Sequence, residues 1–242
     1  MFEALIQADQ YLFSAINGLA GRNETTDEIA QFFRDSYIVK GVPVMLVWWG
    51  LWFVRGPHTQ RNRQYLLAGL IASIAAIFAG RALALTLPFR YRPLHHPELE
   101  VILPSGMTHE ALMGWSSFPS DHAVLFFALA TAIFLVHRGL GIVFYIHAAI
   151  AVSLPRIFLA IHFPGDVLFG AFVGVSIILF LVFPLTMAIK KFNVLQFIER
   201  YSHLSYPIIF FVTFQAASMF DSARELVKLV YHLATPLLSF IQ

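Results

Sequence analysis

Two histidines and an aspartate have the residue types and spacing that nucleophilic and acid–base chemistry needs. His162 stands four residues before Asp166, so the carboxylate can hold the imidazole of His162 in the tautomer that exposes a reactive nitrogen. His122 begins a different apolar segment. Of the two histidines, one is a candidate nucleophile and the other a candidate proton donor. Together with the arginines described next, this pattern predicts phosphoryl transfer through a phosphohistidine.

Arginines near these residues supply the matching positive charge. Guanidinium groups carry fork-shaped donors suited to phosphate oxygens, and a serine at the start of a helix adds neutral donors where the helix dipole favours an anion. The candidates are Arg81, Arg90, Arg92, Arg156 and Ser120. No carboxylate cluster of the kind that holds magnesium accompanies them, so we expect arginines to neutralise the phosphate and the mechanism to need no metal.

The composition is typical of a membrane protein. Of the 242 residues, 58% are hydrophobic and 12% are charged, whereas about 25% of the residues of an average soluble domain are charged. The net charge of +2 gives no support to nucleic-acid binding. Because the chain has no cysteine, disulfides, thiolate zinc sites and cysteine nucleophiles are excluded. Nothing in the sequence indicates a cofactor or an oligomeric state.

Apolar segments long enough to cross a bilayer recur along the chain. A hydrocarbon core of about 30 Å needs roughly 20 mostly apolar residues in a helix. We therefore predict an all-α polytopic membrane helix bundle of about six transmembrane helices. Four spans are strong and two are weaker: 65–87, 119–136, 142–161 and 167–189, then 38–54 and 206–220.

The two ends of the chain mix apolar and charged positions. Residues 1–35 and 221–242 suit helices that lie on the membrane surface, although amphipathic helices packed on the bundle have the same pattern. The first residues lack a basic start and a compact apolar stretch, so no cleavable signal peptide is expected. With no repeat or linker, residues 1–242 are interpreted as one domain.

Basic residues predict the orientation of the bundle. The segment 55–63 carries three arginines, Arg138 lies in the next loop on that side, and basic residues follow the fifth span. By the positive-inside rule this side is cytoplasmic, so the loop 88–118 faces away from the cytoplasm. The candidate residues then fall at one membrane face. Since a charged side chain at mid-bilayer costs roughly 2.5–3.5 kcal/mol, such a cluster indicates a site.

Three motifs resemble those of the type-2 phosphatidic acid phosphatases. The first is Arg92-Pro93, with Leu85 at the position where the family has lysine. The second is Pro119-Ser120-Asp121-His122, with aspartate in place of glycine as in the undecaprenyl-diphosphate phosphatase branch. The third has Arg156, His162 and Asp166 at the family spacing, with Pro155 in place of serine. The match covers about residues 65–185, the expected catalytic core.

The resemblance implies a role for each motif residue. His162 attacks phosphorus, Asp166 supports it and His122 protonates the leaving group. Arg92, Ser120 and Arg156 hold the phosphoryl oxygens. Arg81 lies one helical turn before Leu85, so its long side chain is the first substitute for the missing lysine, and Arg90 is the rival.

The expected function is hydrolysis of a lipid phosphate or diphosphate, preferably undecaprenyl diphosphate, at the outer face of a bacterial inner membrane. A phosphotransferase that passes the group to a lipid or sugar acceptor has the same motifs. Phosphatidylglycerophosphate and phosphatidic acid are equally compatible substrates. A transporter that holds the anion without chemistry is the alternative from another class, although transport does not require a histidine paired with an aspartate.

Other polar and aromatic residues have simpler interpretations. His95, His96, Glu98 and His109 have no recognisable metal-ligand spacing, so no metal site is predicted there. His147 is expected to be a packed or hydrogen-bonded histidine within a span. Trp48, Trp49 and Trp52 are predicted to form an interfacial aromatic belt.

Overall fold

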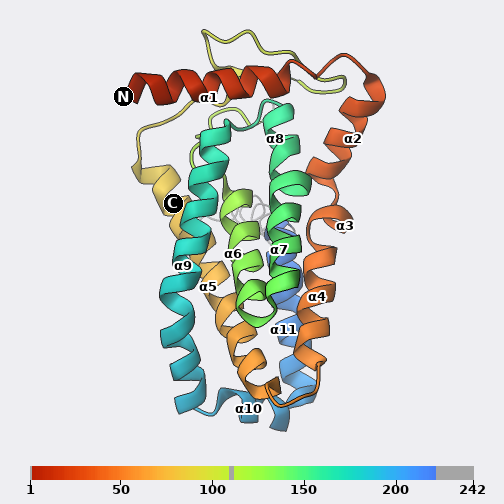
Figure 1. Ribbon diagram of the computed structural model, residues 1–242, viewed down its shortest axis with the longest axis vertical. Helices are drawn as coiled ribbons and strands as arrows, with labels where there is room; N and C mark the ends of the chain where they lie inside the picture. Colours follow the sequence, from red (N-terminus) through yellow and green to blue (C-terminus); the bar gives the residue numbers. More distant parts are fainter. Residues whose placement is uncertain (1, 109–111, 222–242) are drawn as a thin grey trace, which may run out of the picture.

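The protein is a bundle of helices in which one helix lies across an end (Figure 1). The computed structural model describes residues 2–108 and 112–221. The described part contains helices and no strand, which confirms the predicted all-α class. Along the bundle run α4 (Val42–Phe53), α5 (Thr59–Thr86), α6 (Asp121–Val136), α7 (Arg138–His147), α8 (Leu154–Phe158), α9 (Pro164–Lys191) and α11 (Ser202–Ala217). A π-helix, Ala148–Ser153, joins α7 to α8, and the short α10 (Val194–Arg200) joins α9 to α11.

Fewer helices than predicted are long and apolar enough to span a membrane. Three of those described qualify: Thr59–Thr86, Arg138–Phe158 and Pro164–Lys191. A fourth arises if α2 (Glu24–Asp35) and the stretch Tyr37–Phe53 form one span that is broken by a bend of 71°. This stretch consists of the short α3 (Tyr37–Lys40) and α4. The predicted count of six is therefore not confirmed.

Helix α6, predicted as a strong span at 119–136, is shorter than the helices that qualify as spans and lies inside the bundle. Its 16 residues extend about 24 Å at 1.5 Å per residue, less than the hydrocarbon thickness. It packs against α5, α7 and α9, and ten of its residues are buried. A helix that is apolar all round and covered by neighbours needs no amphipathic pattern. Its first turn, Asp121–Val124, is thereby held among the other helices.

Glycines bring α9 unusually close to α6. A Cβ atom added at Gly174 would lie 2.2 Å from the carbonyl oxygen of Val124, and one at Gly170 would lie 2.7 Å from that of Ser120. Small residues allow such backbone approach between membrane helices. The contact fixes the start of α6, with Ser120, beside the start of α9.

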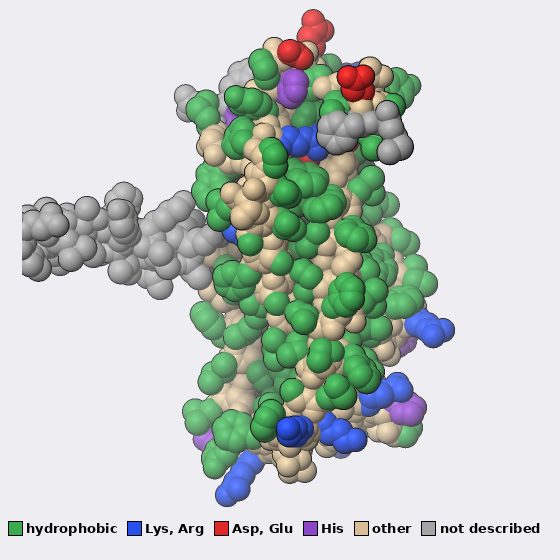
Figure 2. All heavy atoms as spheres, turned by 90° about the vertical axis from the view of Figure 1, so that its left-hand side faces the viewer, with side chains coloured by type: hydrophobic (Ala, Val, Ile, Leu, Met, Phe, Trp, Pro, Cys, Tyr) green, Lys and Arg blue, Asp and Glu red, His purple; other side chains and the backbone are tan. Residues whose placement is uncertain are grey.

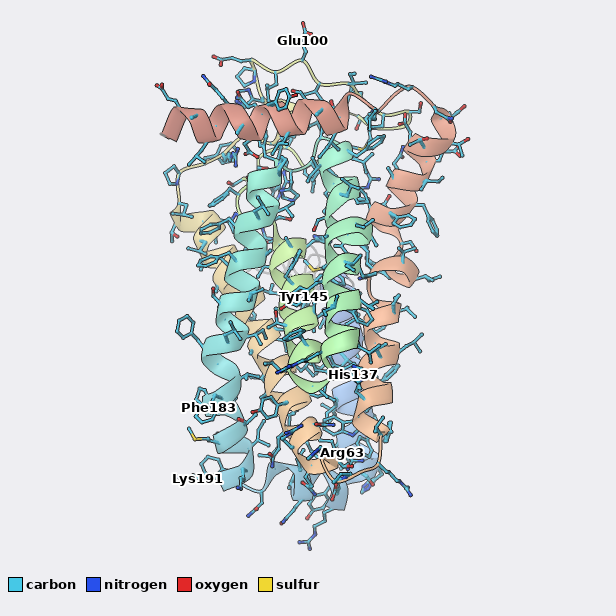
Figure 3. All side chains as sticks on the ribbon, in the orientation of Figure 1. Arg63, Glu100, His137, Tyr145, Phe183 and Lys191 are labelled. Carbon is cyan, nitrogen blue, oxygen red and sulfur yellow. The ribbon has the colours of Figure 1, made fainter. Side chains whose placement is uncertain are left out.

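The two ends of the bundle differ in charge. On the face in Figure 2, acidic side chains gather at the end that α1 crosses, most Lys and Arg side chains lie at the opposite end, and hydrophobic side chains cover the length between. Figure 3 shows Glu100 at the first end and Arg63 and Lys191 at the second. The protein is an integral membrane protein whose basic loops share one end.

Helix α1 (Phe2–Asn17) packs onto the bundle end. It contacts α8 and α9, and the fully buried ring of Phe13 lies 5.5 Å from that of Phe163. The predicted surface helix at 221–242 lies, apart from Asp221, outside the described residues.

The predicted aromatic belt is wrong for two of its three tryptophans. Trp48 and Trp52 are 2% and 1% exposed in the core. The indole N–H of Trp49 donates to Thr213 Oγ1 at 3.1 Å, and its ring lies 6.3 Å from that of Tyr206. These rings pack α4 onto its neighbours through the van der Waals contacts of their large surfaces.

The α6–α9 contact predicts a large effect of substitution at Gly174. Gly174→Val should lower the free energy of unfolding by about 1–3 kcal/mol or more, because the added side chain meets the backbone of Val124. Thermal unfolding in detergent measures the loss. Gly50→Val is the matched control, since nothing lies within 4 Å of a Cβ at Gly50. Equal melting temperatures for both variants would contradict the packing.

Candidate active site

A cavity of about 220 Å³ lies near the end of the bundle that α1 crosses. Its walls come from α5, the loop before α6, the start of α6, α8 and the α8–α9 loop. Five predicted site residues line it: Arg81, Arg92, His122, Arg156 and His162. The other three predicted residues, Ser120, Asp166 and Arg90, do not line it. Chain segments far apart in sequence therefore meet around one polar cavity.

The imidazole of His162 is held by a backbone carbonyl. His162 is 4% exposed, and its Nδ1 lies 2.8 Å from the carbonyl oxygen of Ser117. A nitrogen that faces a carbonyl must carry the proton, so Nε2 keeps its lone pair. The nearest oxygen of Asp166 is 3.6 Å from Nδ1, longer than a hydrogen bond. Ser117 thus fixes the tautomer, and the carboxylate acts on the ring by its charge.

Asp166 is a fully buried carboxylate with three donors. Its Oδ2 accepts from the backbone N–H of Phe163 at 2.8 Å and from the hydroxyl of Ser117, while its Oδ1 accepts from Arg90 at 2.5 Å. It also lies in the first turn of α9, where the helix dipole stabilises negative charge. These contacts keep the side chain ionised behind His162.

The guanidinium of Arg90 faces two carboxylates. Besides Asp166, it donates to Asp9 Oδ2 at 2.6 Å, and it lies 4.3 Å above the ring of Phe163. Its planar fork therefore bridges two acidic side chains behind the cavity. Sequence reasoning missed Asp9 and Ser117, because nothing in the local pattern distinguishes either of them.

Two arginines of the cavity are buried without an ion-pair partner in the described part of the chain. Arg92 is 8% exposed and Arg156 is 6% exposed. Arg92 donates to the carbonyl oxygens of Ile161 at 2.9 Å and Ser116 at 3.3 Å, and its Nη1 lies 3.5 Å from His162 Nε2. A cation removed from water without a counter-ion favours binding of an anion.

Burial lowers the pKa of Arg92 to about 10, although the negative charges of Asp166 and Asp121 oppose the effect. The side chain therefore remains a cation at neutral pH. Arg156 follows the π-helix and Pro155 on α8. Its Nε, like that of Arg92, has no hydrogen-bond partner among the described residues. The hydrogen-bonding capacity of neither guanidinium is therefore fully used within the described part of the protein.

Arg81 and Asp121 form an ion pair at a more exposed part of the cavity. Their side chains are 2.7 Å apart and 35% and 19% exposed, and the guanidinium lies 4.9 Å over the ring of Trp115. Leu85, at the position of the family's lysine, is 78% exposed and does not line the cavity. Of the two proposed substitutes, Arg81 is the one that reaches the cavity.

Ser120 and His122 lie at the start of α6. Ser120 is fully buried, its amide donates to the carbonyl oxygen of Asp166 at 3.1 Å, and its Oγ has no partner among the described residues. His122 lines the cavity and stacks on Phe126 with ring centroids 6.5 Å apart. The predicted catalytic and phosphate-binding roles of the eight residues remain predictions.

Further predictions concern residues outside the cavity. Within 2–108 and 112–221, no three His, Cys, Asp or Glu side chains are placed to hold a metal ion. His109 lies outside these ranges. His147 Nε2 is hydrogen bonded to the carbonyl oxygen of Val39 at 2.8 Å, which confirms a structural histidine.

Comparison with known proteins identifies a matching family and a similar protein. The model of the PAP2 superfamily matches residues 64–189. The bacitracin transport permease protein BcrC of Bacillus licheniformis is 30% identical over 169 residues, which cover 69% of this chain and 76% of that protein.

Two solved structures are also similar. Aquifex aeolicus LpxE is 22% identical with a TM-score of 0.49, covering 70% of this chain and 92% of that one. The first transmembrane PAP2 type phosphatidylglycerolphosphate phosphatase from Bacillus subtilis is 20% identical with a TM-score of 0.48, covering 78% and 89% of the two chains.

The environment of His162 predicts its titration. Burial lowers the pKa of the imidazole and the charges of Arg92 and Arg156 add to the effect, while Asp166 opposes it. The neutral ring should therefore persist below the ordinary value of about 6.5. Asp166→Asn removes the opposing charge and should lower the pKa of His162 further. Nuclear magnetic resonance titration of labelled histidine measures the pKa of His162 in the original protein and in the variant. A midpoint above 6.5 in the original protein, or a higher pKa in the variant, would contradict the geometry.

Proposed function

We propose, from the premise that this chain belongs to the PAP2 superfamily and is a membrane lipid phosphatase, that it hydrolyses a lipid diphosphate through a phosphohistidine. The preferred substrate is undecaprenyl diphosphate. One observation carries the proposal: the unprotonated nitrogen of His162 lies 3.5 Å from the buried guanidinium of Arg92, in a cavity that Arg156 also lines. A nucleophile beside buried cations suits attack on a phosphate anion.

In the first step, the lone pair of His162 Nε2 attacks the terminal phosphorus. A P–N bond forms as the P–O bond to the bridging oxygen breaks, while Arg92 and Arg156 stabilise the charge on the transferred phosphoryl oxygens. His122 donates a proton to the leaving oxygen, which departs with the lipid phosphate. Asp166 stabilises the positive charge that develops on the imidazole of His162.

In the second step, water hydrolyses the phosphohistidine. His122, now neutral, accepts a proton from the attacking water, the reverse of its first role. The P–N bond breaks and inorganic phosphate leaves, so both histidines return to their starting states. A phosphotransferase would differ only in that a lipid or sugar hydroxyl replaces the water.

The distribution of arginines supports a diphosphate over a monophosphate. Arg92 and Arg156 are deeply buried near His162, whereas Arg81 lies at a more exposed part of the same cavity. The deep pair suits the terminal phosphate, and Arg81 suits the phosphate that carries the lipid. The hydrophobic surface of the bundle leaves the lipid tail in the bilayer (Figure 2).

The proposed location is a bacterial inner membrane with the cavity outside the cytoplasm. The argument is the positive-inside rule, because the basic loops are at the end opposite α1. The relative from Bacillus licheniformis is named a transport permease, and transport without chemistry is the alternative here. Holding an anion does not require a buried histidine with one nitrogen kept free, so hydrolysis is preferred.

Phosphate release tests the reaction and the nucleophile together. Purified protein should release inorganic phosphate from undecaprenyl diphosphate faster than from phosphatidylglycerophosphate or phosphatidic acid, with vanadate inhibiting and chelators having no effect. His162→Ala should lower kcat by at least about 10³-fold, as loss of a nucleophile does. The control His58→Ala removes an exposed histidine and should keep full activity. Full activity of His162→Ala, or binding without turnover, would reject the mechanism.

Arg81 and Arg90 should differ in kinetic effect. Arg81→Ala removes a charge-assisted contact with the second phosphate, so KM for the diphosphate should rise roughly tenfold and KM for a monophosphate should change little. Arg90→Ala should lower kcat at a nearly constant KM, because Arg90 contacts Asp166 behind the cavity. The reverse pattern would assign phosphate binding to Arg90.

A further inference from the structure

The N-terminal helix contributes a carboxylate to the rear of the active site. Asp9 lies in the middle of α1, and its side chain is 13% exposed. Its Oδ1 accepts from the backbone N–H of Gly165 at 2.7 Å, and its Oδ2 accepts from Arg90 at 2.6 Å. One side chain thus contacts both the residue before Asp166 and the cation that binds Asp166.

These contacts form a continuous chain to the nucleophile. Arg90 forms ion pairs with both Asp9 and Asp166. Asp166 accepts a hydrogen bond from the hydroxyl of Ser117, and the backbone carbonyl oxygen of Ser117 is hydrogen bonded to the imidazole of His162. Asp9, Arg90 and Asp166 do not line the cavity. Any effect of Asp9 on the reaction must therefore pass through its neighbours.

The position of Asp9 is set closely by packing. A Cβ atom added at Gly165 would lie 2.8 Å from Asp9 Oδ2, so glycine is what allows the carboxylate to reach the N–H. One helical turn along α1, the ring of Phe13 packs against Phe163. Helix α1 is therefore held against the start of α9 by a polar contact and an apolar contact.

The charges of this cluster bear on the imidazolium that forms during the reaction. The cation Arg90 lies between two carboxylates, so the group retains one net negative charge next to His162. Without Asp9, the positive charge of Arg90 would be balanced by Asp166 alone, and the cluster would be neutral. The attraction that stabilises a positive ring would then weaken.

We propose that Asp9 is a positioning residue of the active site, which holds Arg90 so that Asp166 stays ionised and oriented behind the nucleophile His162. This inference rests on the proposed function, since it assumes that His162 is the nucleophile. It makes the N-terminal helix part of the active-site structure, although α1 lies outside the 64–189 region that matches the superfamily model.

The groups that face His162 decide the direction of the pH effect. They are the carboxylate of Asp166 and the cations Arg92 and Arg156, with His122 across the cavity and Arg90 behind Asp166. Removing the charge of Asp9 leaves more of the Arg90 charge acting on the ring. Protonation of His162 then becomes harder, and the acid limb of kcat moves to lower pH.

The test compares Asp9→Asn with Glu3→Gln, an exposed carboxylate on the same helix. Asparagine keeps an acceptor for the Gly165 N–H but loses the charge and the second oxygen, which accepts from Arg90. We expect Asp9→Asn to lower kcat by about tenfold, to change KM less than about twofold, and to shift the acid limb to lower pH. Asp9→Glu should recover part of the loss, and Glu3→Gln should match the original protein.

A double-mutant cycle shows whether Asp9 acts through Arg90. The double variant Asp9→Asn/Arg90→Gln should be no slower than Arg90→Gln alone, because the second change removes the connection. Gly165→Ala gives a second route to the same contact, since its Cβ displaces the carboxylate of Asp9, and kcat should fall again.

The outcomes separate this inference from the proposed function. Full activity of His162→Ala would reject the nucleophile and the proposal that depends on it. An inactive His162→Ala together with an unchanged kcat and pH profile in Asp9→Asn would reject only the role of Asp9. Additive effects in the cycle would also overturn that role.

Discussion

The structure depends on two arginine side chains that are buried without a carboxylate partner. Removing a guanidinium from water costs several kcal/mol unless other groups replace the lost contacts. For Arg92, the carbonyl oxygens of Ser116 and Ile161 do so. Those carbonyls belong to the loops that flank α6 and α8, and Ala160 adopts a positive φ of 56° in the second of them. The conformations of these two loops therefore place the carbonyl oxygens that keep the positive charge of Arg92 in the cavity.

Most cations of the site line the cavity, and two of its carboxylates lie behind it. Arg81, Arg92 and Arg156 line the cavity, whereas the carboxylates of Asp9 and Asp166 lie behind His162 with Arg90 between them. Asp121 also lines the cavity but is paired with Arg81, so Arg92 and Arg156 are the cations left without an ion-pair partner among the described residues. In the proposed reaction, the ring of His162 becomes positive when its nitrogen bonds to phosphorus, and the carboxylates behind it stabilise that charge. A single histidine can thus face an anionic substrate and still carry a positive charge afterwards.

The sequence was sufficient to bring His122, His162, Arg92, Arg156 and Arg81 together, because apolar spans alternate in direction and place their polar ends at one face. It was not sufficient for Ser117 and Asp9. A carbonyl oxygen is present in every residue, so no sequence pattern distinguishes the one from Ser117 that binds His162. Asp9 meets Arg90 only because α1 turns across the bundle end, and that angle depends on packing of Phe13. Likewise, tryptophans suit both a membrane interface and a core, and only the neighbours of α4 decide between them.

The glycine contact between α6 and α9 has a mechanical consequence. Because α9 approaches the backbone of α6 so closely at Gly170 and Gly174, sliding of one helix past the other would bring their backbones into collision. A change in bilayer thickness must then be met by tilting of the whole bundle or deformation of the surrounding lipid. The spacing between His122 on α6 and His162 just before α9 is thereby insulated from the lipid mixture in which the protein resides.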